Sequence, residues 1–297
     1  MKNVILQTGE DRRATVRKAV EELGEDFITK CRASEYIFIK VNLIDHERQL
    51  ACTHVDAVRG VLDVIRTYCK TPVKIGDASH SGTMAGFDNF GYERLLDEYN
   101  KVELIDLNDD DFVDGHTVRK DGSENPIRRS KTAVEAQMKI CIAPLKVHDD
   151  VLLDACVYSW TTGTWIVPSR ISVVGRVWAR WPWLQEEGQI AHSQSIIELY
   201  KQSKCDVAIV DGIIAMEGNG PVEGSMVEMG VVVAGYDPVA VDAVCATLIG
   251  LEPLEIGYLQ MIAREELGEI DLSKINVPPM LITELAKQFR LPQNFEN

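Results

Sequence analysis

Residues 206–221 have the sequence DVAIVDGIIAMEGNGP, and the interpretation of the rest of the chain starts from this stretch. Its run Val207–Val210 is short, apolar and partly β-branched, which favours a buried strand over a helix. We expect that strand to end at Asp211-Gly212. An apolar hinge and the turn-rich loop 217–221 follow, and the glycines of the loop allow backbone amides to approach a ligand closely. This pattern outlines one side of an α/β crevice.

The next segment predicts a second strand and a helix. Val231–Val233 is β-branched, and Asp237-Pro238 has the residue types typical of a helix N-cap and first helical position. Asp242 lies among the apolar residues of that helix, where an unpaired carboxylate would cost several kcal/mol of desolvation. We therefore expect Asp242 to face a cation, a hydrogen-bond donor or the crevice.

Upstream of this stretch, strand patterns and helix patterns alternate, which predicts an α/β fold with a mostly parallel sheet flanked by helices. We found no internal repeat or Gly/Ser linker, so residues 1–297 are expected to form a single domain with an inserted excursion at 108–137. The expected strands are 3–7, 36–43, 72–77, 102–107 and 139–144, and the expected helices are 15–23, 53–69, 90–99, 193–203 and 254–267.

The central stretch resembles a known family. The motifs VDGIIAMEGNGPVEG (210–224) and GYDPVAVDAV (235–244) are similar to those of the domain of unknown function 362 family. Three earlier motifs, IFIKVNL (37–43), TPVKIGDAS (71–79) and IAPLKVH (142–148), match its other landmarks in the same order. The resemblance implies the family's fold, but the family name assigns no activity, so the function has to be argued from the residues.

Composition excludes several classes of function. A net charge of -15 argues against non-specific nucleic-acid binding, which needs a basic surface. No N-terminal signal and no apolar run near the roughly 20 residues of a transmembrane helix are present, so a cytoplasmic protein is expected. The seven cysteines include no CxxC pair, so no iron–sulfur cluster is expected, although relatives of the family sometimes carry a ferredoxin-type module.

Polar residues stand where four of the expected strands end. In open parallel sheets, ligands bind outside the carboxyl ends of the strands, so these side chains are expected to converge on one pocket. Residues two apart in an extended chain point the same way, which pairs Lys40 with Asn42 and Lys146 with His148. The predicted catalytic residues are Lys146, His148, Asp211 and Asp242, and the predicted substrate-binding residues are Lys40, Asn42, Asp77, Glu217, Gly218, Gly220 and His192.

Two chemistries fit this set of side chains. In the first, the lysines and glycine-loop amides bind a small anionic metabolite while His148 and an acid transfer protons, as an enzyme would. In the second, Asp211, Glu217 and a histidine such as His148 bind a divalent cation. The reaction class stays open, and no ligand spacing is diagnostic of a metal.

The chain departs from the family pattern after the IAPLKVH motif. Relatives usually have a Lys-Asn pair about ten residues beyond the histidine, and the matching positions here are Tyr158-Ser159. If that lysine is catalytic in relatives, this chain has altered or lost their activity. A non-catalytic binding or scaffold protein is therefore the alternative to an enzyme.

All five tryptophans fall within residues 160–183, together with Arg170, Arg176 and Arg180 and no acidic residue. Trp and Arg dominate protein contacts, so this segment is expected to be a lid over the crevice or an interface in a homo-oligomer. The alternative, to which we give equal weight, is that the segment is a Trp-rich part of the hydrophobic core.

Overall fold

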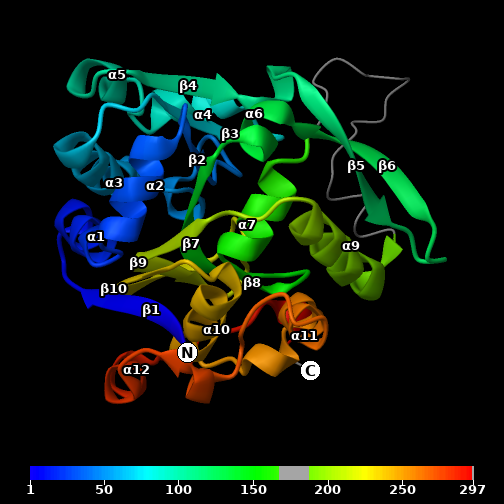
Figure 1. Cartoon of the computed structure of the whole chain (residues 1–297). Coiled ribbons are helices and arrows are strands. Elements are labelled where there is room, and N and C mark those ends of the chain that lie inside the picture. Colours follow the sequence, from blue (N-terminus) through cyan, green and yellow to red (C-terminus); the bar gives the residue numbers. More distant parts are fainter. Residues whose placement is uncertain (167–186, 296–297) are drawn as a thin grey trace.

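The computed structural model describes residues 1–166 and 187–295. It contains a nine-stranded mixed sheet with helices on both faces and a separate two-stranded hairpin (Figure 1). The strand order is β11-β1-β10-β9-β7-β2-β3-β4, with β8 paired to β7. The neighbouring strands from β9 to β4 run parallel, whereas β1, β10 and β9 pair antiparallel. The predicted α/β class with a mostly parallel sheet is confirmed.

The bounds of the elements are as follows. The sheet strands are β1 (Lys2–Thr8), β2 (Ile37–Val41), β3 (Val73–Asp77), β4 (Val102–Asp106), β7 (Met138–His148), β8 (Leu152–Asp154), β9 (Val207–Glu217), β10 (Ser225–Gly235) and β11 (Ile275–Asn276), and the hairpin is β5 (Phe112–Val118) with β6 (Glu124–Ser130). The α-helices of the described residues are α1 (Arg12–Glu21), α2 (Glu25–Ala33), α3 (Val55–Tyr68), α4 (Thr83–Asn89), α5 (Arg94–Glu98), α6 (Lys131–Glu135), α7 (Cys156–Gly163), α9 (Gln189–Gln202), α10 (Pro238–Leu248), α11 (Gly257–Arg264) and α12 (Pro279–Leu285).

The central strands are apolar along both faces because helices cover both faces of the sheet. In β9, Val207 and Ile209 pack into the hydrophobic core beneath α1, α2 and α3. Ala208 and Val210, which point the opposite way, pack into the core beneath α7, α9 and α10. All four side chains are fully buried. This arrangement explains why the run 207–210 shows no alternation of polar and apolar residues.

The strand that we expected to end at Asp211-Gly212 continues to Glu217, and this part of the prediction is wrong. The apolar residues 214–216 pair with β10 in an antiparallel hairpin, so β10 supplies the backbone partners that extend β9. Gly212 fits inside the strand because a Cβ there would lie 2.8 Å from Val231 Cγ2. The turn is confined to residues 218–224, after which β10 leads to α10 with Asp237 as its N-cap, as predicted.

The predicted excursion at 108–137 lies within the described residues, whereas the tryptophan-rich segment does so only in part. Residues 112–130 form the hairpin β5–β6, which pairs with itself and packs against α9 (Figure 1). Trp160 is fully buried, donates its indole N–H to Ser203 O over 2.9 Å and packs edge-on against Phe38. Trp165 joins a small buried cluster with two aliphatic side chains. The rest of the predicted lid or interface, residues 167–183, lies outside the described residues.

Candidate functional site

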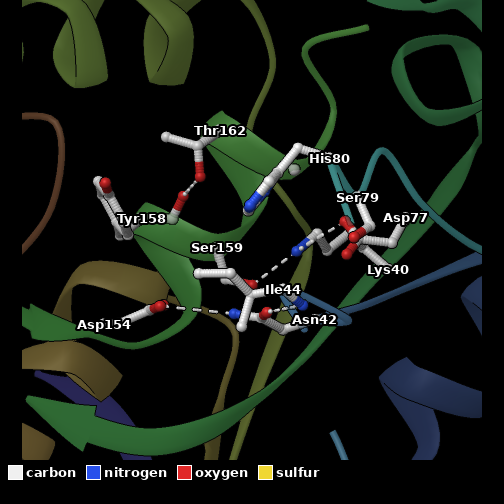
Figure 2. Close-up of a pocket in the computed structure, with 11 residues that line it drawn as sticks. Lys40, Asn42, Ile44, Asp77, Ser79, His80, Asp154, Tyr158, Ser159 and Thr162 are labelled. Carbon is white, nitrogen blue, oxygen red and sulfur yellow. Dashed lines mark hydrogen bonds and ion pairs between the residues drawn. The ribbon is translucent and has the colours of Figure 1, made fainter. Parts of the chain in front are cut away.

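A small polar cavity lies at the carboxyl ends of β2 and β3, where β8 and α7 close it (Figure 2). Its volume is about 20 Å³, which is room for about one water molecule or one functional group of that size. Three of the predicted substrate-binding residues, Lys40, Asn42 and Asp77, line this cavity. The other polar residues of its wall are Ser79, His80, Asp154, Tyr158, Ser159 and Thr162.

Lys40 is buried on the wall of the cavity. Its Nζ donates to Ser159 Oγ over 2.7 Å and lies 3.3 Å from Asp77 Oδ1. The other oxygen of Asp77 accepts the backbone N–H of Leu43 over 2.8 Å, which fixes the carboxylate in place. Gly163 of α7 leaves the space for the ammonium, because a Cβ there would lie 2.1 Å from Lys40 Cε. The cavity therefore has an oriented, charge-balanced cation on its wall.

Asp154 at the end of β8 is the residue that the sequence reasoning missed. The antiparallel pairing of β8 with β7 places Asp154 opposite Lys146, whose Nζ lies 3.2 Å from Asp154 Oδ2. The amide of Asn42 also approaches Oδ2, at 3.5 Å. Asp154 is 1% exposed, and its Oδ1 has no hydrogen-bond partner. The available signal was an Asp two positions before a helix, at the end of a three-residue strand that is too short to show a pattern.

Lys146 contacts Asp154 but is not among the residues that line the cavity. Its side chain is fully buried, and Nζ donates to the carbonyl oxygens of Ala51 over 2.8 Å and of Pro221 over 3.4 Å. The lysine therefore ties β7 to two loops and orients the Asp154 carboxylate. Lys146, predicted to be catalytic, is thus placed next to a residue that lines the cavity and not among the lining residues themselves.

The two predicted histidines, His148 and His192, contact Tyr158 on the side away from the cavity lining. The rings of His148 and Tyr158 meet edge to face with centroids 4.9 Å apart, and the Tyr158 hydroxyl lies 3.3 Å from His192 Nε2. Burial, together with nearby His148, lowers the pKa of His192 to about 3, so its imidazole is neutral at physiological pH. His148 Nδ1 accepts the backbone N–H of Asp150. Neither imidazole ring lines the cavity, and both pack against Tyr158, which does.

Asp242 holds α7 in position. It is fully buried on α10, and its carboxylate accepts the backbone N–H groups of Cys156 over 2.9 Å and of Val157 over 3.0 Å. The hydroxyl of Tyr258 adds a longer contact of 3.4 Å. Burial raises the pKa of Asp242 well above its ordinary value, and the backbone N–H groups oppose that shift. Of the partners expected for Asp242, the structure provides hydrogen-bond donors.

Asp211 and Glu217 each pair with an arginine. Asp211 Oδ2 lies 2.7 Å from Arg12 Nε, and burial raises the pKa of Asp211 while Arg12 opposes the shift. Glu217 accepts both the backbone N–H and the Nε–H of Arg290, from the C-terminal tail. Among the described residues, the metal-ligating side chains that gather within 4.8 Å are His148, Asp149 and Asp150. The structure thus does not bring together the cation ligands predicted as Asp211, Glu217 and His148.

The predicted glycine loop packs against protein instead of the cavity. Gly218 has a left-handed φ of 78° and donates its N–H to Arg290 O over 2.8 Å. At Gly220, an added Cβ would lie 2.1 Å from Val147 O, so the missing side chain is what lets the turn approach β7. Both glycines are explained by the path of the backbone.

The fold and the site together define an α/β protein with a buried polar cavity at the carboxyl ends of parallel strands. The family model described as Domain of unknown function (DUF362) matches residues 37–247, and the chain belongs to this family. The match includes every wall residue of the cavity named above. The positions where relatives usually have Lys-Asn, Tyr158 and Ser159, form part of that wall.

Two known proteins are similar to this chain, one in sequence and one in fold. A thylakoid-associated protein of Synechocystis sp. is 29% identical over 262 residues, which cover 86% of this chain and 74% of that protein. The lactate racemase apoprotein of Thermoanaerobacterium thermosaccharolyticum has a similar fold, with a TM-score of 0.50 at 16% identity. That alignment covers 78% of this chain but 54% of the racemase, so the chain spans about half the length of the racemase.

Within residues 1–166 and 187–295, no helix combines the length and apolar character needed to cross a membrane.

Proposed function

We propose that this protein is an enzyme that binds a small anionic metabolite with its reacting end in the cavity beside Lys40. The observation that carries the proposal is the buried Lys40 ammonium on the cavity wall, held by Ser159 and Asp77. A fixed cation in a water-poor site stabilises negative charge that develops during a reaction, without reorganising first. The Lys40–Asp77 ion pair and the Asp154 carboxylate, which line the cavity, would supply the acid–base groups.

The size of the cavity limits what enters it. A volume of about 20 Å³ admits a single group such as a hydroxyl or a carbonyl oxygen. The remainder of the metabolite, including its anionic group, would lie at the opening, near the exposed His80. We therefore expect a molecule of a few carbon atoms, and the reaction to take place at the group that reaches Lys40.

The test is a thermal-shift screen of small anionic metabolites, followed by mass spectrometry of the compounds that stabilise the protein. The wild type should be stabilised by at least one compound and should then consume it. Removing Lys40 alone would leave the buried Asp77 unpaired, so the informative variant is the double substitution Lys40→Met with Asp77→Asn. A matched control is Lys74→Met, because Lys74 lies on the neighbouring β3 and pairs with Glu103 at the protein surface.

The stabilisation by ligand should vanish in the double variant and persist in Lys74→Met. A compound that binds at Lys40 but is never consumed would identify a non-catalytic binding protein instead. If no compound stabilises the wild type, or if the double variant keeps the full shift, the proposal is wrong.

A further inference from the structure

Two buried groups on the cavity wall retain hydrogen-bonding capacity that the described residues do not use. Asp154 Oδ1 is buried without a hydrogen-bond partner. Lys40 Nζ carries three N–H donors, of which Ser159 and Asp77 take two. Asp154 and Lys40 approach the cavity from opposite sides, with Ser159 and Asn42 between them (Figure 2). One residue with an unused acceptor and one with an unused donor thus both line this cavity.

We propose that the cavity recognises one hydroxyl group of the metabolite. The hydroxyl donates its proton in a hydrogen bond to Asp154 Oδ1 and accepts one from Lys40 Nζ. The inference rests on the function proposed above, since it concerns the same cavity. It assigns Asp154 as the specificity-determining residue and names the substrate class as small hydroxylated acids.

The acceptor of Asp154 and the donor of Lys40 match a hydroxyl group better than a charged group. A carboxylate offers no donor to Asp154, and an ammonium offers no acceptor to Lys40, whereas a hydroxyl provides both. Charge leads to the same choice. Lys40 is balanced by Asp77 and Lys146 by Asp154, so a neutral group leaves these buried pairs undisturbed. An ion of either sign in the cavity would stand uncompensated in a buried site.

The neighbours of Asp154 fix which of its oxygens serves the ligand. Lys146 and Asn42 both approach Oδ2, which leaves Oδ1 as the carboxylate oxygen without a hydrogen-bond partner among the described residues. In an Asp154→Asn variant, the buried Lys146 ammonium would require the amide oxygen as its acceptor. The amide NH₂ group would then take the place of Oδ1, and a donor would replace the acceptor that the hydroxyl needs.

The experiment compares hydroxylated acids with analogues that lack the hydroxyl, using NMR titration of the full chain. The pairs are glycolate with acetate, lactate with propionate, and malate with succinate. In the wild type, the hydroxylated member should bind about tenfold or more tightly, since a site built for a hydroxyl rejects analogues that leave its polar groups unpaired. In Asp154→Asn the ratio of the two dissociation constants should fall to about one. The matched control Asp150→Asn, in the turn before β8, should keep the wild-type ratio.

Folding of each variant is checked by circular dichroism. If Asp154→Asn does not fold, the double variant Asp154→Asn with Lys146→Met, which removes both buried charges, takes its place. Equal binding of both members of every pair by the wild type would overturn the inference, because the cavity would then hold only water. In that case a compound found in the metabolite screen would still support the proposed enzyme. Failure of every compound to bind would overturn both.

Discussion

Asp242→Ala is the substitution whose consequences the structure specifies in most detail. The variant removes the acceptor of two buried backbone N–H groups, those of Cys156 and Val157, at the start of α7. Each buried donor left without a partner costs about 1–3 kcal/mol, so the free energy of unfolding should fall by about 2–6 kcal/mol. Because α7 carries Ser159 and Gly163, the loss of this cap should also weaken ligand binding at Lys40.

The assay is urea unfolding followed by far-UV circular dichroism, with ligand binding measured on the folded variant. Asp237→Ala is the matched control, because Asp237 is the N-cap of α10, the helix that carries Asp242, but does not line the cavity. That variant should lose about 1 kcal/mol, typical of an N-cap, and should bind ligand as the wild type does. A loss below about 1 kcal/mol in Asp242→Ala would refute the argument that its carboxylate satisfies buried donors.

Three further outcomes follow from individual contacts. His192 is neutral when folded and binds a proton below its ordinary pKa of 6.5 when unfolded, so acid should destabilise the wild type from pH 6.5 toward about 3. At pH 5 the effect is about 2 kcal/mol, and unfolding of His192→Gln at pH 7.5 and pH 5 should lack it. Gly163→Ala should fold but bind ligand more weakly by titration, since a Cβ there would displace Lys40. Glu217→Ala should change the free energy of unfolding by no more than about 1 kcal/mol and leave ligand binding intact, because its partner Arg290 is 62% exposed. A marked loss of ligand affinity in this variant would show that Glu217 contributes to the binding site.

Local patterns in the sequence predicted the class of fold because β-branched runs and capping residues act over short distances. Val207–Val210 and Asp237-Pro238 are such cases, and the structure has a strand and a capped helix there. The end of β9 was missed because its extension depends on pairing with β10, a partner that the sequence of β9 does not encode. A strand end set by tertiary pairing leaves no local signal.

The candidate site was predicted in part for a related reason. Lys40, Asn42 and Asp77 line the cavity because they end two parallel strands, a position that the alternation of strands and helices reveals. Asp211 looked equivalent, but its partner is Arg12, which is 199 positions away and gave no signal of this contact. Asp154 escaped notice because a three-residue strand shows no periodicity, even though its pairing with β7 puts it opposite Lys146.

A crystal structure of the protein with a metabolite that stabilises it tests the proposed site most directly. We expect a ligand hydroxyl within hydrogen-bonding distance, about 2.6–3.2 Å, of both Asp154 Oδ1 and Lys40 Nζ. A ligand bound elsewhere, such as in the surface groove lined by Leu254 and Arg264, with only water between Asp154 and Lys40, would contradict this expectation.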